Sequence, residues 1–114
     1  MNLYQELIIK NQFNLFNVID KKIFLVELFD NIRNHVDTQC QICISSCHQY
    51  RYQFNKKKIY QSQDNIIEKV NIFEKECFNK LDSLQCNKLF DFEKSIRKEI
   101  LMIYETIFNN VFLL

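Results

Sequence analysis

The sequence of 114 residues contains neither glycine nor proline. Glycine adopts positive φ angles without steric cost and proline pre-forms many turns, so tight β-hairpins are difficult to build without them. Glycine-rich phosphate-binding loops and the Gly-x-Ser-x-Gly nucleophile elbow are excluded for the same reason. The composition therefore favours an all-α fold and removes many enzyme scaffolds.

Apolar residues recur at steps of three or four along most of the chain, which is the spacing of one face of an α-helix. Two such series begin at Ile66 and at Phe92. Another, similar to a coiled-coil seam, includes three clustered cysteines. Its members are Leu25, Phe29, Ile32, Val36, Cys40, Cys43, Cys47, Tyr50 and Phe54. This spacing predicts helices that pack through their apolar seams.

Polar gaps indicate the boundaries of these helices. The stretch QSQDN (Gln61–Asn65) offers Ser62 and Asp64 as caps for a new helix. We predict one helical domain over residues 1–114: a long antiparallel helical hairpin with an additional N-terminal helix. The helices are expected at about 3–17, 21–58 and 65–112, with a turn at 59–64. A break near 82 is permitted by the local Asp-Ser pair.

The stretch CQICISSCH, residues 40–48, holds three of the five cysteines. A hairpin folded about residue 62 would place Cys47 opposite Cys77 and Cys40 opposite Cys86, with Cys43 left as a free thiol. This symmetry favours a disulfide-stapled hairpin. The alternative is that the cysteines stay reduced and act as small apolar residues on a helix face.

These cysteine positions resemble those of the coiled-coil-helix–coiled-coil-helix proteins of the mitochondrial intermembrane space. That family has a helical hairpin with nested disulfides, and it includes accessory subunits of respiratory complexes. The resemblance covers about residues 40–86. The chain departs from the family pattern because its cysteine pairs are separated by six and eight residues instead of nine, and because Cys43 is extra.

A metal site is a further alternative, with Cys40, Cys43, Cys47 and His48 as ligands. Structural zinc takes four tetrahedral ligands, usually from a knuckle or loop, whereas this stretch has a helical pattern. No catalytic residue is predicted, because the adjacent Cys47 and His48 side chains diverge by about 100° on a helix. No cofactor is expected.

The stretch YRYQFNKKKIY (Tyr50–Tyr60) carries Arg51, Lys56, Lys57 and Lys58. These residues could bind an anionic surface, such as lipid head groups or an acidic protein, or could be a solvated helix connection. The net charge of the whole chain is only +1. No nucleic-acid partner is expected from so balanced a chain.

Two segments are apolar on more than one helix face, IFLVELF (Ile23–Phe29) and residues 100–114. A helix that is apolar all round must be buried in something larger. We therefore expect other protein subunits as partners, or contact with a membrane surface. No window of about 18 consecutive apolar residues is present.

The sequence is most consistent with a non-catalytic structural or accessory subunit of a larger assembly. The family resemblance implies a mitochondrial respiratory-chain complex and the intermembrane-space side of the inner membrane. The alternative is a cytosolic or cytoskeletal helical scaffold with reduced cysteines. A third hypothesis is a zinc- or copper-handling helical module.

Overall fold

The computed structural model describes residues 13–49 and 56–112, and the side chains of residues 13–46 and 57–105. Within these ranges the chain forms three α-helices, two short 3₁₀ turns and no strand, so the predicted all-α class is confirmed. The helices are α2 (Val18–Gln49), α3 (Lys56–Asn79) and α4 (Cys86–Phe112), and the 3₁₀ turns are η1 (Phe13–Leu15) and η2 (Leu81–Ser83).

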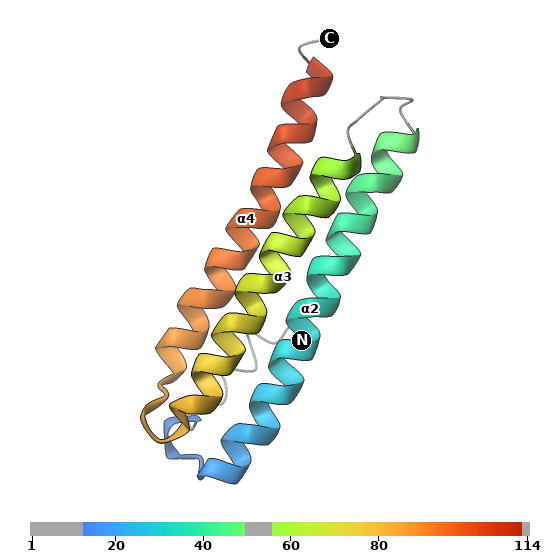
Figure 1. Cartoon of the computed structure of the whole chain (residues 1–114). Helices are drawn as coiled ribbons and strands as arrows, with labels where there is room; N and C mark the ends of the chain where they lie inside the picture. The colour runs from blue at the N-terminus through green and yellow to red at the C-terminus, as the bar shows by residue number, and fades with distance from the viewer. Residues whose placement is uncertain (1–12, 50–55, 113–114) are drawn as a thin grey trace.

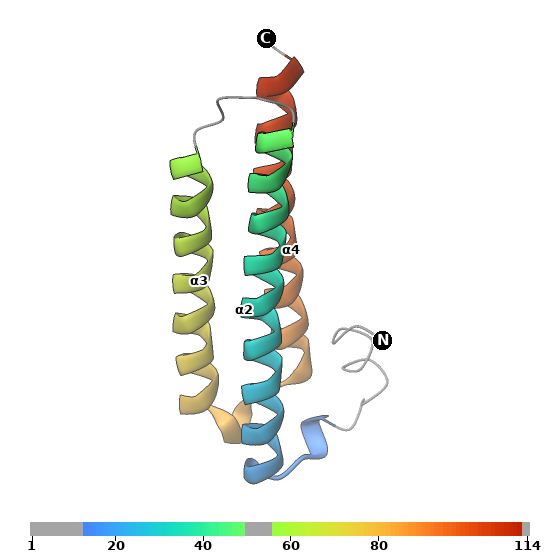
Figure 2. The same cartoon turned by 90° about the vertical axis from the view of Figure 1, so that its right-hand side faces the viewer.

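The three helices run side by side in alternating directions. α3 returns along α2, and α4 then runs in the same direction as α2 (Figure 1). In the view turned by 90°, α3 stands to one side, while α4 lies behind α2 and overlaps it (Figure 2). The molecule is elongated, with extents of 53 × 25 × 17 Å.

The prediction of a turn between two helices at residues 59–64 is wrong. α2 ends at Gln49 and residues 59–64 lie inside α3. The polar stretch Gln61–Asn65 lies within a continuous helix, and the buried Ile59 and Ile66 on either side of it keep the core face of that helix unbroken. The interruption expected near residue 82 is present as η2.

The start of α2 depends on an asparagine cap. The side chain of Asn17 accepts a hydrogen bond from the backbone N–H of Asp20, at 2.8 Å. Such a cap satisfies one of the N–H groups that have no partner within the helix. The predicted helix over residues 3–17 largely precedes the described residues. Its described part is not α-helical, since Phe13–Leu15 is a 3₁₀ turn.

The turn between α3 and α4 is built without glycine. Backbone hydrogen bonds tighten it, from Lys80 N to Cys77 O at 3.2 Å and from Ser83 N to Lys80 O at 3.1 Å. The first N–H of α4, from Cys86, donates to the side chain of Asn14 at 3.0 Å. A residue 72 positions earlier in the chain therefore caps α4.

The core joins the three helices through phenylalanine rings. Phe29 of α2 is fully buried, and its ring centroid lies 6.1 Å from that of Phe73 and 6.4 Å from that of Phe92. The rings of Phe73 and Phe92 stack, with centroids 4.0 Å apart. Because the rings come from α2, α3 and α4, this cluster holds all three helices together.

Candidate functional site

Cys40 and Cys43 lie one helical turn apart on the buried face of α2, each 1% exposed. The hydroxyl of Tyr104, from α4, lies beside them and donates to the side-chain oxygen of Gln39 at 2.7 Å. Burial and the nearby Cys43 thiol raise the pKa of Tyr104 to about 12. Cys40 and Tyr104 are therefore protonated near pH 7 and pack closely with Cys43.

Burial dominates the acid–base properties of the cysteines. It raises the pKa of Cys40 to about 11, with further contributions from Cys43 and the Asp37 carboxylate. It raises the pKa of Cys77 to about 12, with contributions from Glu76 and Glu74. The pKa of Cys86 is also raised by burial. A nucleophilic or metal-binding cysteine needs the thiolate form, which these sites disfavour.

The structure does not support the predicted disulfide between Cys40 and Cys86. Both residues carry reduced thiols. Tyr104 is the α4 residue at the level of Cys40, and it follows Cys86 by 18 residues, or about 27 Å of helix. A disulfide requires Cα atoms within about 7 Å.

The predicted Cys47–Cys77 disulfide is not supported either. Cys77 carries a reduced thiol, and the side chain of Cys47 lies outside the described residues. Cys47 is two residues from the end of α2, next to the start of α3, whereas Cys77 follows that start by 21 residues, or about 30 Å. The pairing depended on a turn near residue 62, and the connection instead falls between Gln49 and Lys56.

The alternative metal site is only partly within the described side chains. Cys40 and Cys43 point into the core, while the side chains of Cys47 and His48 lie outside them. Among the side chains that are described, no group of three His, Cys, Asp or Glu residues is arranged to hold a metal ion. The metal hypothesis remains a prediction.

The basic residues of the stretch Tyr50–Tyr60 are also only partly within the described side chains. Arg51 and the side chain of Lys56 lie outside the described residues, and Lys57 and Lys58 are exposed in the first turn of α3. The positive end of the helix dipole adds to their charge. Binding of an anionic surface at this end remains a prediction.

Two buried charged residues were not expected from the sequence. Lys21 is 5% exposed, and its Nζ donates to the carbonyls of Leu81 at 3.1 Å and Leu84 at 3.3 Å, across the α3–α4 turn. Glu93 is 7% exposed and pairs with Arg97 at 2.9 Å. Both continue an apolar helix face: Lys21 lies four residues before Leu25, and Glu93 lies four residues after Leu89. This spacing was the signal in the sequence that could have predicted their burial.

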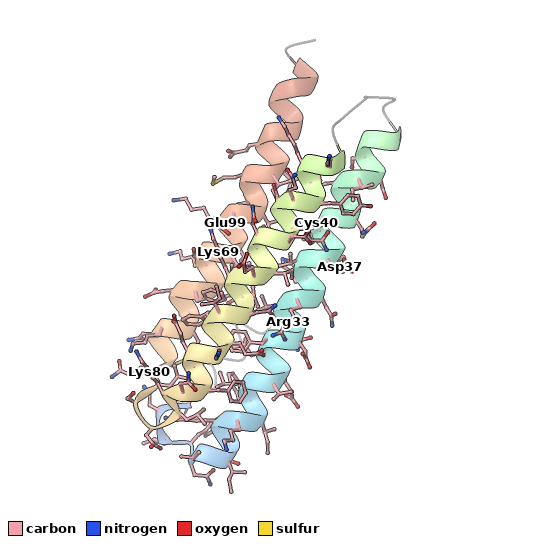
Figure 3. The ribbon with its side chains drawn as sticks, viewed as in Figure 1. Arg33, Asp37, Cys40, Lys69, Lys80 and Glu99 are labelled. Carbon is pink, nitrogen blue, oxygen red and sulfur yellow. The ribbon has the colours of Figure 1, made fainter. Side chains whose placement is uncertain are left out.

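Polar contacts join α2 to α3 along their exposed side. Arg33 forms an ion pair with Glu74, and Gln63 donates to Asp37 at 2.8 Å (Figure 3). These contacts show which residues of α2 lie opposite which residues of α3. The level of Cys40 on α2 therefore meets the first half of α3, near Gln63.

An open groove of about 330 Å³ lies between the first half of α3 and the second half of α4. Ile59 and Ile66 are its buried apolar floor, and Met102 is exposed at its edge. An ion pair between Lys69 and Glu99 crosses it (Figure 3). The second carboxylate oxygen of Glu99, Oε2, is buried and has no hydrogen-bond partner among the described residues. The sequence did not indicate this groove, because its walls belong to different helices.

A second surface, the α2 stripe, consists of Ile19, Ile23 and Val26, which are 68%, 57% and 51% exposed. Their spacing of four and three residues puts them on one helix face. Leu15, 83% exposed, precedes them in the chain. This stripe includes two residues of the IFLVELF segment, whose other apolar residues are buried. Apolar residues therefore do lie on two faces of this segment.

None of the described helices has an apolar stretch long enough to cross a membrane. No protein-family model, curated protein or solved structure matches this chain.

Proposed function

We propose that this protein is a non-catalytic helical scaffold that acts as a structural subunit of a larger protein assembly. The observation that carries the proposal is the α2 stripe. Three large aliphatic side chains on one face of a helix, each more than half exposed, are typical of a protein–protein contact.

The buried thiols support the form of this proposal in which the cysteines are apolar core residues. Cys40, Cys43, Cys77 and Cys86 are all reduced and at most 8% exposed. A mitochondrial accessory subunit stapled by disulfides would need an oxidised form of these cysteines. The scaffold with reduced cysteines needs no such change.

The native size of the protein in its own cells tests this proposal. A tagged chain should elute from gentle extracts well above the 13.9 kDa mass of one chain. Ile23→Asp should shift it to small size, because a charge in the stripe opposes burial. Ile42→Asp is the matched control, since Ile42 is also an exposed residue of α2 but lies outside the stripe. Elution of the unmodified protein as a single chain would refute the proposal.

A further inference from the structure

We propose that the groove between α3 and α4 binds the α2 stripe of a second copy of this chain, so that copies assemble head to tail. This inference rests on the proposed scaffold function and specifies its partner. Its basis is that the stripe, continued along the same helix face to Asp30, matches the groove in length, in apolar character and in the placement of charge.

The lengths of the two surfaces agree. The groove extends along α3 from Lys58 to Lys69, a separation of 11 positions, or about 16 Å of helix. The face of α2 that begins at Ile19 and ends at the exposed Asp30 covers the same separation of 11 positions. One α2 segment therefore fits the groove from end to end.

The apolar parts of the two surfaces also correspond. A helix bound in a groove uses anchors at positions i, i+4 and i+7. Ile19, Ile23 and Val26 have this spacing. They would cover Ile59 and Ile66 at the groove floor, and would contact Met102 at its edge. Binding would thus remove from water the most exposed apolar face of α2.

Charge selects the direction of the bound helix. Lys22 lies in the first turn of the α2 segment and Asp30 at its end, both exposed. In the groove, Glu99 and Lys69 form an ion pair with each other at one end, so their charges balance, while the exposed Lys58 lies at the opposite end. With the second α2 antiparallel to α3, Asp30 reaches Lys58.

The reverse direction would put Lys22 near Lys58. Like charges at that end oppose the reverse arrangement. Asp30 is accessible for the favourable contact, because its side chain is 66% exposed even while paired with Arg33.

The stripe and the groove lie on different faces, because α2 contributes no residue to the groove. Each copy can therefore present its stripe to one neighbour and its groove to another. A contact of this heterologous kind produces a ring if the rotation closes and an open filament if it does not.

Light scattering of the purified full-length chain over a concentration series tests the inference. The unmodified chain should form species larger than a dimer as its concentration rises toward about 1 mM. Ile23→Asp in the stripe and Met102→Asp in the groove should each give a monomer. Leu101→Asp should assemble normally, since Leu101 is 59% exposed and Met102 is 55% exposed, but only Met102 lines the groove.

Mixing the two disabled variants gives the decisive result. The Ile23→Asp chain keeps an intact groove and the Met102→Asp chain keeps an intact stripe, so an equal mixture should form a two-chain complex and stop there. Circular dichroism of each variant checks that the helices remain folded.

Three outcomes would overturn the inference: a monomer at every concentration, equal effects of Leu101→Asp and Met102→Asp, or loss of assembly only in Ile23→Asp. The last outcome would indicate a stripe-to-stripe dimer. A monomeric purified chain that still joins a large, Ile23-dependent assembly in cells would leave the scaffold function intact and assign the stripe to a different protein.

Discussion

The thiols of Cys40 and Cys77 lie in the core, 1% and 2% exposed. An ionised thiolate loses its hydration there, so burial raises the pKa of these groups to about 11 and about 12. At neutral pH the side chains behave as small apolar residues. Their position on the core face, more than their clustering in sequence, determines this role.

These raised pKa values predict a loss of stability at alkaline pH. The unfolded chain releases the thiol protons near pH 9, whereas the folded chain holds them to pH 11 or above. The stabilising contribution is therefore complete below pH 9 and is lost as the pH rises toward 11–12. The urea midpoint should fall over this range, and Cys40→Ala should reduce the slope of that fall. An unchanged slope would contradict the assignment to Cys40.

The buried Lys21 gives a second prediction at this scale. Lys21→Met keeps much of the apolar stem but removes the donor to Leu81 O and Leu84 O. Leaving buried acceptors without a partner should lower the free energy of unfolding by about 1–3 kcal/mol. Urea denaturation measures this value. Lys22→Met, at the exposed neighbouring position, should change it by no more than about 0.5 kcal/mol.

At the scale of the elements, α4 begins with help from a distant residue. The N–H of Cys86 is capped by Asn14, which lies within η1. Lys21 of α2 binds the other side of the same turn. The α3–α4 connection thus depends on two side chains from the N-terminal part of the chain.

Removal of the Asn14 cap should destabilise the start of α4. We expect Asn14→Ala to lower the free energy of unfolding by about 1 kcal/mol, the usual contribution of a helix cap. Asn14→Asp should retain stability, because a carboxylate still accepts the hydrogen bond and is favourable near a helix N-terminus. Thermal and urea unfolding of the two variants provide the comparison. Equal losses in both would show that the oxygen acceptor is not the reason for the effect.

The helical periods could be predicted from the sequence, but the connection between α2 and α3 could not. Ser62 and Asp64 looked like caps because short polar side chains favour helix starts. In the structure both lie inside α3, whose core side continues through Ile59 and Ile66. Without glycine or proline, nothing in the sequence marked a helix end more strongly than this polar stretch.

At the scale of the whole molecule, the three helices share one core cluster. Phe29, Phe73 and Phe92 come from three different helices and their rings are in contact. Sequence periodicity identified each as a core residue, since all three lie on the predicted seams. It could not identify their meeting point, nor the α3–α4 groove, because both depend on the level at which the helices face each other.

Loss of this cluster should destabilise the whole bundle. Phe29→Ala should lower the free energy of unfolding by about 3–5 kcal/mol, because the fully buried ring leaves a cavity bordered by two other helices. The far-ultraviolet and near-ultraviolet circular dichroism transitions should shift together. Separate transitions would instead indicate that one helix unfolds independently of the others.

The capping of α4 by Asn14 and of the adjoining turn by Lys21 has a consequence for folding order. The two contacts join residues 72 and at least 60 positions apart, so closing them costs loop entropy that a local turn would not incur. The α3–α4 turn has no glycine to make it self-sufficient. During synthesis, the N-terminal segment emerges long before the α3–α4 turn that its side chains stabilise. A fragment containing only α3 and α4 would lack Asn14 and Lys21, the two side chains that bind this turn.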